Sequence, residues 1–196
     1  MGGNPPPRIA VLTVSDGASA GRRGDVSGAL LGEWISKQGW ELAGRATVPD
    51  ETHRIVPQLL EWCDSGHDDK RESVGDTGAS GAGSVDMVVT TGGTGFGPRD
   101  VTPEATRAVT DREAPGLAEA IRAAGAAKTR FACLSRGLVG IRGNTAIVNL
   151  PGSPGGVKDA MAVLEPLVPH LTDLLRGDTE HGQDFHPARP DAGGQS

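Results

Sequence analysis

Strand-like and helix-like stretches alternate along the chain. Residues 9–14 form a near-continuous apolar run, which is typical of a strand buried on both faces of a sheet. Residues 27–38 carry apolar side chains at helical spacing, and residues 40–48 and 85–91 predict two further strands. Because strands and helices alternate, we predict an α/β domain with a mainly parallel sheet and helices on both faces.

Three helices are expected between and after these strands. An apolar stripe over residues 55–63 predicts a helix whose start Pro57 delays, or which that proline kinks. Thr102 followed by Pro103 predicts a helix start, with threonine as the capping residue. Residues 117–127 predict the third helix.

The last part of the predicted domain adds a hairpin and a broken helix. Residues 131–141 and 145–150 are apolar runs separated by residues 142–144, a pattern that predicts a β-hairpin. Ser153-Pro154 repeats the cap-then-proline signal. The helical stretch that follows is interrupted by two prolines and ends by Arg176.

Three polar segments lie outside this alternation. Residues 1–7 form a Pro/Gly leader and residues 177–196 form a polar tail, and we expect both to lack fixed structure. A Gly/Ser/Asp-rich segment at about residues 65–84 is interpreted as a flexible surface insertion. The sequence thus predicts a single domain over residues 8–176.

Composition excludes several classes of protein. The net charge of −6 and an aromatic content of 3% argue against a nucleic-acid surface, because such surfaces are basic and often stack bases on aromatic rings. No apolar run is long enough for a membrane span, and the N-terminal residues have no signal-peptide core, so we expect no membrane association and a cytoplasmic location. Cys63 and Cys133 lie in apolar stretches and are expected to be buried core thiols.

The candidate chemistry lies in loops that follow the predicted strands. The chain holds 30 glycines, about twice the average usage, and many follow apolar runs directly. Loops at Ser15-Asp16, at residues 49–51 and at residues 92–100 are expected at one carboxyl edge of the sheet, where open parallel sheets bind ligands. A fourth glycine-rich loop, residues 150–156, follows the hairpin.

Each feature of these loops also has a plain structural interpretation. Asp50, Asp100 and Ser153 are all good helix- or turn-capping residues, and the glycines at residues 92–97 could simply form a turn. Neither a phosphate-binding GxxxxGK[ST] loop, nor a complete GxGxxG, nor a zinc-type His/Cys cluster is present. Two carboxylates near several amide-rich turns nevertheless suit a magnesium-bound polyphosphate.

Four separated motifs, in order, resemble one known family. The segment VVTTGGTGFGPRDVTPEAT (residues 88–106) is similar to the signature of the Mog/MoaB-type molybdenum cofactor biosynthesis proteins, the molybdopterin adenylyltransferases. IAVLTVSDGASAGRRGDVSG near the start, VPDE at residues 48–51 and LSRGLVGIRGNTAIVNLPGSPGGV at residues 134–157 agree as well. The resemblance covers about residues 8–176. It implies a three-layer α/β/α domain, usually a homotrimer, that transfers AMP from Mg-ATP to molybdopterin and releases pyrophosphate.

The resemblance also implies roles for individual residues. Asp50 and Asp100 match the family's two essential aspartates and are expected to be catalytic and to bind Mg²⁺. The residues that match its molybdopterin- and ATP-binding turns are Ser15, Asp16, Ser27, Gly92, Gly93, Thr94, Gly95, Ser135, Gly152, Ser153 and Pro154. Two departures are the segment at about residues 65–84 and the C-terminal tail, which could alter the rim or assembly of a trimer.

We therefore predict an enzyme that adenylylates molybdopterin, whose product passes to a molybdate-insertion protein. The attacking group is the ligand's own phosphate, so no protein nucleophile is needed, and catalysis depends on positioning and electrostatics. Arg99 or Arg136 could offset negative charge, although solvated surface arginines are more common. Two alternatives stay open: a catalytically weak paralogue that binds molybdopterin, and a trimeric scaffold of the same fold.

Overall fold

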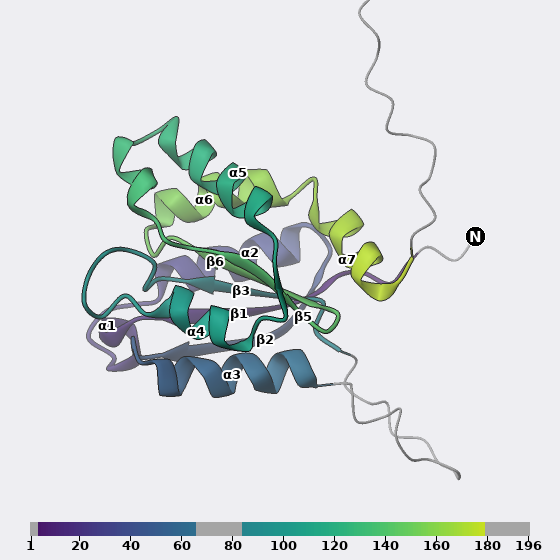
Figure 1. Ribbon diagram of the computed structural model, residues 1–196, viewed down its shortest axis with the longest axis horizontal. Coiled ribbons are helices and arrows are strands. Elements are labelled where there is room, and N and C mark those ends of the chain that lie inside the picture. The colour runs from purple at the N-terminus through teal and green to yellow at the C-terminus, as the bar shows by residue number, and fades with distance from the viewer. Residues whose placement is uncertain (1–3, 66–83, 179–196) are drawn as a thin grey trace, which may run out of the picture.

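The structure is a computed structural model that describes residues 4–65 and 84–178 (Figure 1). Within these residues six strands form one sheet in the order β2-β1-β3-β6-β5-β4. Strands β2, β1, β3 and β6 run parallel, whereas β5 and β4 continue the sheet in antiparallel fashion. The strands are β1 (Arg8–Val14), β2 (Glu41–Val48), β3 (Met87–Thr91), β4 (Arg112–Glu113), β5 (Val139–Arg142) and β6 (Thr145–Leu150).

Helices cover both faces of this sheet, so the expected three-layer α/β/α architecture is confirmed (Figure 1). Helices α2, α5, α6 and α7 pack on one face, and α3 and α4 pack on the other. The helices are α1 (Asp16–Ser19), α2 (Val26–Lys37), α3 (Thr52–Asp64), α4 (Thr102–Val109), α5 (Pro115–Ala126), the 3₁₀ turn η2 (Arg130–Leu134), α6 (Pro154–Leu164) and α7 (Val168–Arg176).

Strand β1 shows why the central strands are mostly apolar. Ile9 and Val11 belong to the core under α2 and α6, while Ala10, Leu12 and Val14 belong to the core under α3 and α4. Each of these five residues is essentially inaccessible to solvent. Since successive side chains of a strand point to opposite faces, a strand covered on both sides carries apolar residues on both faces.

The connections place a crevice between β1 and β3. The chain leaving β1 enters α2 on one face of the sheet, whereas the chain leaving β3 enters α4 on the other face. The two loops therefore diverge from neighbouring parallel strands at the same carboxyl edge. Such a switch point is where open α/β sheets bind ligands.

Several local expectations are corrected by the structure. Thr102 does not cap α4: its hydroxyl donates to the carbonyl of Gly92, and Val101 takes the capping position without a side-chain bond. Helix α3 begins at Thr52 and contains Pro57, so this proline does not delay the start. The first hairpin strand is only Val139–Arg142, because residues 130–134 form η2 and then turn toward the sheet.

The cysteines differ in their surroundings. Cys63 is buried in the core between α3 and the sheet, and burial raises the pKa of its thiol to about 12. Cys133 lies in η2 and is exposed, so the expectation of a buried thiol is wrong there. Residues 130–134 are apolar in part but stand on the surface beside α5, where periodicity gives no signal of exposure.

Part of the expected leader is held against the domain. Asn4 donates to Asp173, and the carbonyls of Pro5 and Pro6 accept hydrogen bonds from Arg176. The expectation of no fixed structure therefore does not hold for residues 4–7. The expected insertion, apart from its ends, and the tail from residue 179 onward lie outside the described residues. Within the described residues, no helix is long and apolar enough to cross a membrane.

Candidate active site

A cleft of about 960 Å³ opens at the carboxyl edge of the parallel strands. Loops after β1, β2, β3 and β6 form its floor, and α5 with η2 forms one wall. All but one of the residues predicted to be catalytic or to bind substrate line it, namely Ser15, Ser27, Asp50, Gly92, Gly93, Thr94, Gly95, Asp100, Ser135, Gly152, Ser153 and Pro154. The exception is Asp16, which lies beside the cleft and not on its wall.

The floor of the cleft is backbone packed against backbone. Gly92 has a φ of +100°, and a Cβ atom there would lie 2.2 Å from the carbonyl oxygen of Val14. A Cβ on Gly152 would lie 3.1 Å from the Cα of Gly92. Glycine is thus required where the loops after β1, β3 and β6 meet, because any side chain would push them apart.

Three successive amides face no partner at this point. Within the described residues, the N–H groups of Gly93, Thr94 and Gly95 donate no hydrogen bond to the protein, whereas that of Gly92 is bound by Leu150. Two carboxylates flank them: a Cβ on Gly93 would lie 2.9 Å from Oδ1 of Asp50, and a Cβ on Gly95 would lie 3.0 Å from Oδ2 of Asp100. Free amides between acidic groups can hold the oxygens of a cation-bound phosphate.

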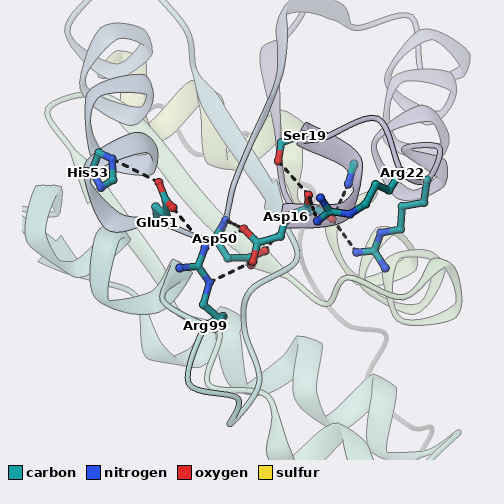
Figure 2. A network of polar contacts seen from close by, with 10 residues as sticks. Asp16, Ser19, Arg22, Asp50, Glu51, His53 and Arg99 are labelled. Atoms are coloured by element: carbon teal, nitrogen blue, oxygen red, sulfur yellow. Dashed lines mark hydrogen bonds and ion pairs between the residues drawn. The ribbon is translucent and has the colours of Figure 1, made fainter.

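Asp50 is fixed by a reciprocal pair of bonds with Asp16 (Figure 2). The N–H of Asp16 donates to Oδ2 of Asp50 at 2.7 Å, and the N–H of Asp50 donates to Oδ1 of Asp16 at 3.1 Å. Asp50 makes no side-chain bond to α3, so the capping interpretation is wrong; Glu51 occupies that position. Partial burial raises the pKa of Asp50, and the nearby carboxylates of Asp16 and Asp100 raise it further.

Asp100 closes the loop that precedes it. Its Oδ2 accepts from the N–H of Gly97 at 2.7 Å, and its own N–H donates to the carbonyl of Gly97. The interpretation of Asp100 as a cap for the turn into α4 is therefore wrong. Arg136 supports this loop from behind, since its guanidinium donates to the carbonyls of Gly95 and Asp100 and pairs with Glu104. The cation of Arg136 also lowers the pKa of Glu104.

Arg99 is neither free nor simply solvated. It binds both carboxylate oxygens of Asp16, at 3.1 Å through Nε and 2.8 Å through a terminal nitrogen, and it reaches Glu51 at 3.4 Å (Figure 2). The hydrogen bond from Arg99 lowers the pKa of Asp16, and in turn raises the pKa of Arg99. Both carboxylate oxygens of Asp16 thus accept hydrogen bonds from the protein, and its substrate-binding role stays a prediction.

The predicted serines are placed at helix starts and turns. Ser15 caps α1 and accepts a bond from Arg23 at 2.7 Å. Ser27 donates to the carbonyl of Gly152, which ties α2 to the loop after β6. Ser153 caps α6 as predicted, and Ser135 accepts from the N–H two residues later. Each of these serines thus lines the cleft, and its hydroxyl is hydrogen-bonded within the cleft wall.

Sequence reasoning missed several charged residues of the cleft, which are Arg23, Asp25, Arg122, Lys128 and Asp159. Arg23 and Asp25 belong to the glycine-rich loop after β1, and charged residues in a loop already expected at the site were the signal that could have indicated them. Asp25 caps α2; burial opposes its ionisation, but bonds from Arg45, Gly28 and Thr13 together lower its pKa. Arg122 and Lys128 come from α5 and its end, and nothing in the helical pattern marks them as cleft residues.

The donor set fits a magnesium ion that arrives with a polyphosphate. Within the described residues, no group of three or more His, Cys, Asp or Glu side chains could by itself enclose a metal ion. Magnesium is usually held by one or two carboxylates together with substrate phosphates and water. Asp50 and Asp100 supply such carboxylates, and Oδ1 of Asp50 accepts no hydrogen bond within the described part of the chain.

The fold and the cleft define an α/β domain with a candidate ligand site at the carboxyl edge of its sheet. Residues 10–170 match a family described as the probable molybdopterin binding domain, and the chain belongs to this family. The bifunctional molybdenum cofactor biosynthesis protein of Chlorobaculum tepidum is 36% identical over 88% of this chain. This chain spans 49% of that relative and 26% of another, the cinnamon protein of Drosophila melanogaster.

Other relatives are matched over most of their own length. The molybdopterin adenylyltransferase of Helicobacter pylori strain J99 is 34% identical over 87% of this chain and 88% of its own. Among solved structures, the molybdopterin biosynthesis enzyme MoaB of Thermus thermophilus is 42% identical, with a TM-score of 0.72 over 87% of this chain and 96% of that one. The resemblance to Mog/MoaB-type proteins is thus confirmed.

Proposed function

We propose that the protein adenylylates molybdopterin, using Mg-ATP and releasing pyrophosphate. The observation that carries this proposal is the run of three unpaired amides, Gly93 to Gly95, between the carboxylates of Asp50 and Asp100. Relatives named molybdopterin adenylyltransferases, matched over most of both chains, support it. The cleft volume is at the upper end of the range for ligand pockets, as a site for two sizeable substrates requires.

The reaction asks for positioning and charge control. An oxygen of the terminal phosphate of molybdopterin attacks the α-phosphorus of ATP, the new P–O bond forms, and the bond to pyrophosphate breaks. In this proposal the amides of residues 93–95 bind phosphate oxygens. The N-terminus of α6, including the N–H of Gly155, which is unpaired among the described residues, offers a second group of donors. Rigid donors stabilise developing charge without reorganising.

Asp50 and Asp100 are the residues that would hold magnesium. The ion, when bound with ATP, neutralises phosphate charge as a Lewis acid. The two carboxylates would orient it, and Arg23 and Lys128, which also line the cleft, add positive charge for two polyanions in a chain whose net charge is −6. No protein group forms a covalent bond in this scheme.

Pyrophosphate release tests the proposal. The purified chain is incubated with ATP, magnesium and molybdopterin, and pyrophosphate is measured with and without each component. Release that needs all three supports the adenylyltransferase. Molybdopterin binding without pyrophosphate release favours the catalytically weak paralogue. If the chain neither binds molybdopterin nor releases pyrophosphate, the trimeric scaffold is the remaining alternative.

Assembly and the fate of the product follow from the same proposal. We infer a homotrimer of this 20.1 kDa chain and transfer of the adenylylated product to a molybdate-insertion protein. Light scattering that gives a mass of about three chains supports the trimer. A monomer at micromolar concentration would contradict it.

A further inference from the structure

The ion pair between Arg99 and Asp16 joins loops that come from different strands. Asp16 follows β1 and Arg99 lies in the loop after β3, and a second carboxylate on Arg99, Glu51, follows β2. The guanidinium of Arg99, carried by the loop after β3, therefore contacts the loops after the two neighbouring parallel strands β1 and β2 (Figure 2). We propose that Arg99 is a positioning residue that, through Asp16, fixes Asp100 relative to Asp50; this inference rests on the proposed function.

Both carboxylate oxygens of Asp16 accept hydrogen bonds from the protein in this arrangement. Its Oδ1 accepts from Arg99 and from the N–H of Asp50, and its Oδ2 accepts from Arg99. Its own N–H holds one oxygen of Asp50. Asp16 thus transmits the position of Arg99 to Asp50 and leaves the other Asp50 oxygen turned toward Gly93.

Arg99 also holds the loop that carries the second carboxylate, Asp100. It directly precedes Asp100, whose side chain closes the turn from Gly97. Among the hydrogen bonds of the described residues, those of Arg99 alone connect residues 95–100 to the loops after β1 and β2. Arg136 holds the opposite side of this loop through Gly95 and Asp100. The loop that carries Asp100 is therefore secured from two sides by two arginines.

A merely structural surface pair would behave differently. Arg99 and Asp16 have side chains that are 55% and 39% exposed, and pairs of this kind contribute little to stability. Arg107 and Glu113 form a comparable pair at 2.8 Å, with side chains 58% and 42% exposed, outside the cleft. If Arg99 positions the site, its loss should change turnover and loop order strongly and overall stability only slightly, whereas loss of Arg107 should leave turnover and loop order unchanged.

The test combines a double-mutant cycle with hydrogen exchange. The variants are Arg99→Gln, Asp16→Asn, the double variant, Arg99→Lys and the control Arg107→Gln, each measured for pyrophosphate release, for molybdopterin binding and for amide exchange over residues 95–100. A displacement of about 1 Å at a catalytic group can cost ~10²-fold in rate. We expect Arg99→Gln and Asp16→Asn each to lower kcat by about 10–100-fold, with molybdopterin Kd changed by less than about threefold.

The pattern across variants decides the proposal. The double variant should be no slower than the slower single variant, because both changes break one contact, and Arg99→Lys should regain part of the rate because it keeps the charge. Residues 95–100 should exchange faster in Arg99→Gln than in Arg107→Gln. Unchanged exchange or additive losses would overturn the positioning role. A wild-type chain that releases no pyrophosphate would instead overturn the proposed function, and with it the catalytic part of this inference.

Discussion

Aspartates lie at both the amino and the carboxyl ends of the parallel strands, and their hydrogen bonding differs. At the amino end, Asp86 is 4% exposed; Oδ2 accepts from the N–H of Arg8 and from Arg176, and Oδ1 accepts from Arg176. At the carboxyl end, Asp50 has one oxygen bound by the N–H of Asp16 and faces other carboxylates. The donors around Asp86 satisfy its buried carboxylate, whereas Asp50 keeps one carboxylate oxygen available for a ligand.

This difference separates a residue that serves stability from one that serves function at opposite ends of the same sheet. A buried carboxylate with a full set of donors contributes to the fold and has little left to offer a ligand. A carboxylate placed next to like charges costs stability, and such an arrangement is typical of functional sites. The comparison predicts that equivalent substitutions at the two ends will have opposite consequences.

The largest expected effect is the loss of turnover in Asp50→Asn and Asp100→Asn. Each change removes a charge opposite a developing anion but keeps the size of the side chain, and one preorganised electrostatic contact is typically worth ~10²–10³ in rate. Pyrophosphate release should fall by that factor while molybdopterin binding persists. Both variants should show the wild-type circular dichroism spectrum, and near-normal turnover in both would reject the two-aspartate mechanism.

Asp86→Asn should do the reverse. Its loss leaves Arg176, whose side chain is 23% exposed, without its ion-pair partner, and breaking a buried pair is strongly destabilising. Because Arg176 keeps some contact with water and with the carbonyls of Pro5 and Pro6, we expect a loss of about 2–3 kcal/mol in the free energy of unfolding. Urea unfolding measures this value. The comparison fails if Asp86→Asn lowers turnover at 25 °C as much as Asp50→Asn does.

Gly92→Ala tests the backbone contacts of the carboxyl end. The new methyl group would meet the carbonyl of Val14 at 2.2 Å in a left-handed conformation, so the loops after β1 and β3 must separate. We expect a loss of about 2 kcal/mol in stability, together with most of the turnover. Gly116→Ala is the matched control, since a Cβ there meets nothing within 4 Å. A Gly92→Ala protein as stable as Gly116→Ala would show that the loops are loosely packed.

The sequence predicted the strands and the edge of the sheet that carries the site better than it predicted individual contacts. Buried apolar runs gave β1, β3 and β6, and the order of strands and helices placed the loops of Asp50 and Asp100 at one edge. The two-residue strand β4 is too short to have a pattern.

Pairings between distant residues left no signal in the sequence. Asp86 and Arg176 are 90 positions apart, and nothing local indicates that they meet. The sequence likewise indicated that Asp16 would lie near Asp50, but not that an arginine 83 positions away would occupy its carboxylate. Local patterns specify elements and the edge at which loops emerge, whereas the partner of each charge is decided by the packed fold.

The smallest expected effect concerns stability and pH at Asp50. Burial raises its pKa, with Asp16 and Asp100 adding to the shift, so the folded chain binds a proton there more tightly than the unfolded chain. Ionised Asp50 therefore destabilises the fold at neutral pH, and this penalty disappears as the pH falls below the unfolded pKa of ~3.9. Asp50→Asn should raise the urea midpoint near pH 7 and change it less near pH 4. Asp16→Asn should lower the midpoint near pH 7, because the hydrogen bond from Arg99 lowers the pKa of Asp16. Shifts of the same sign in both variants would contradict the view that Asp50 gives up stability to remain available for a ligand.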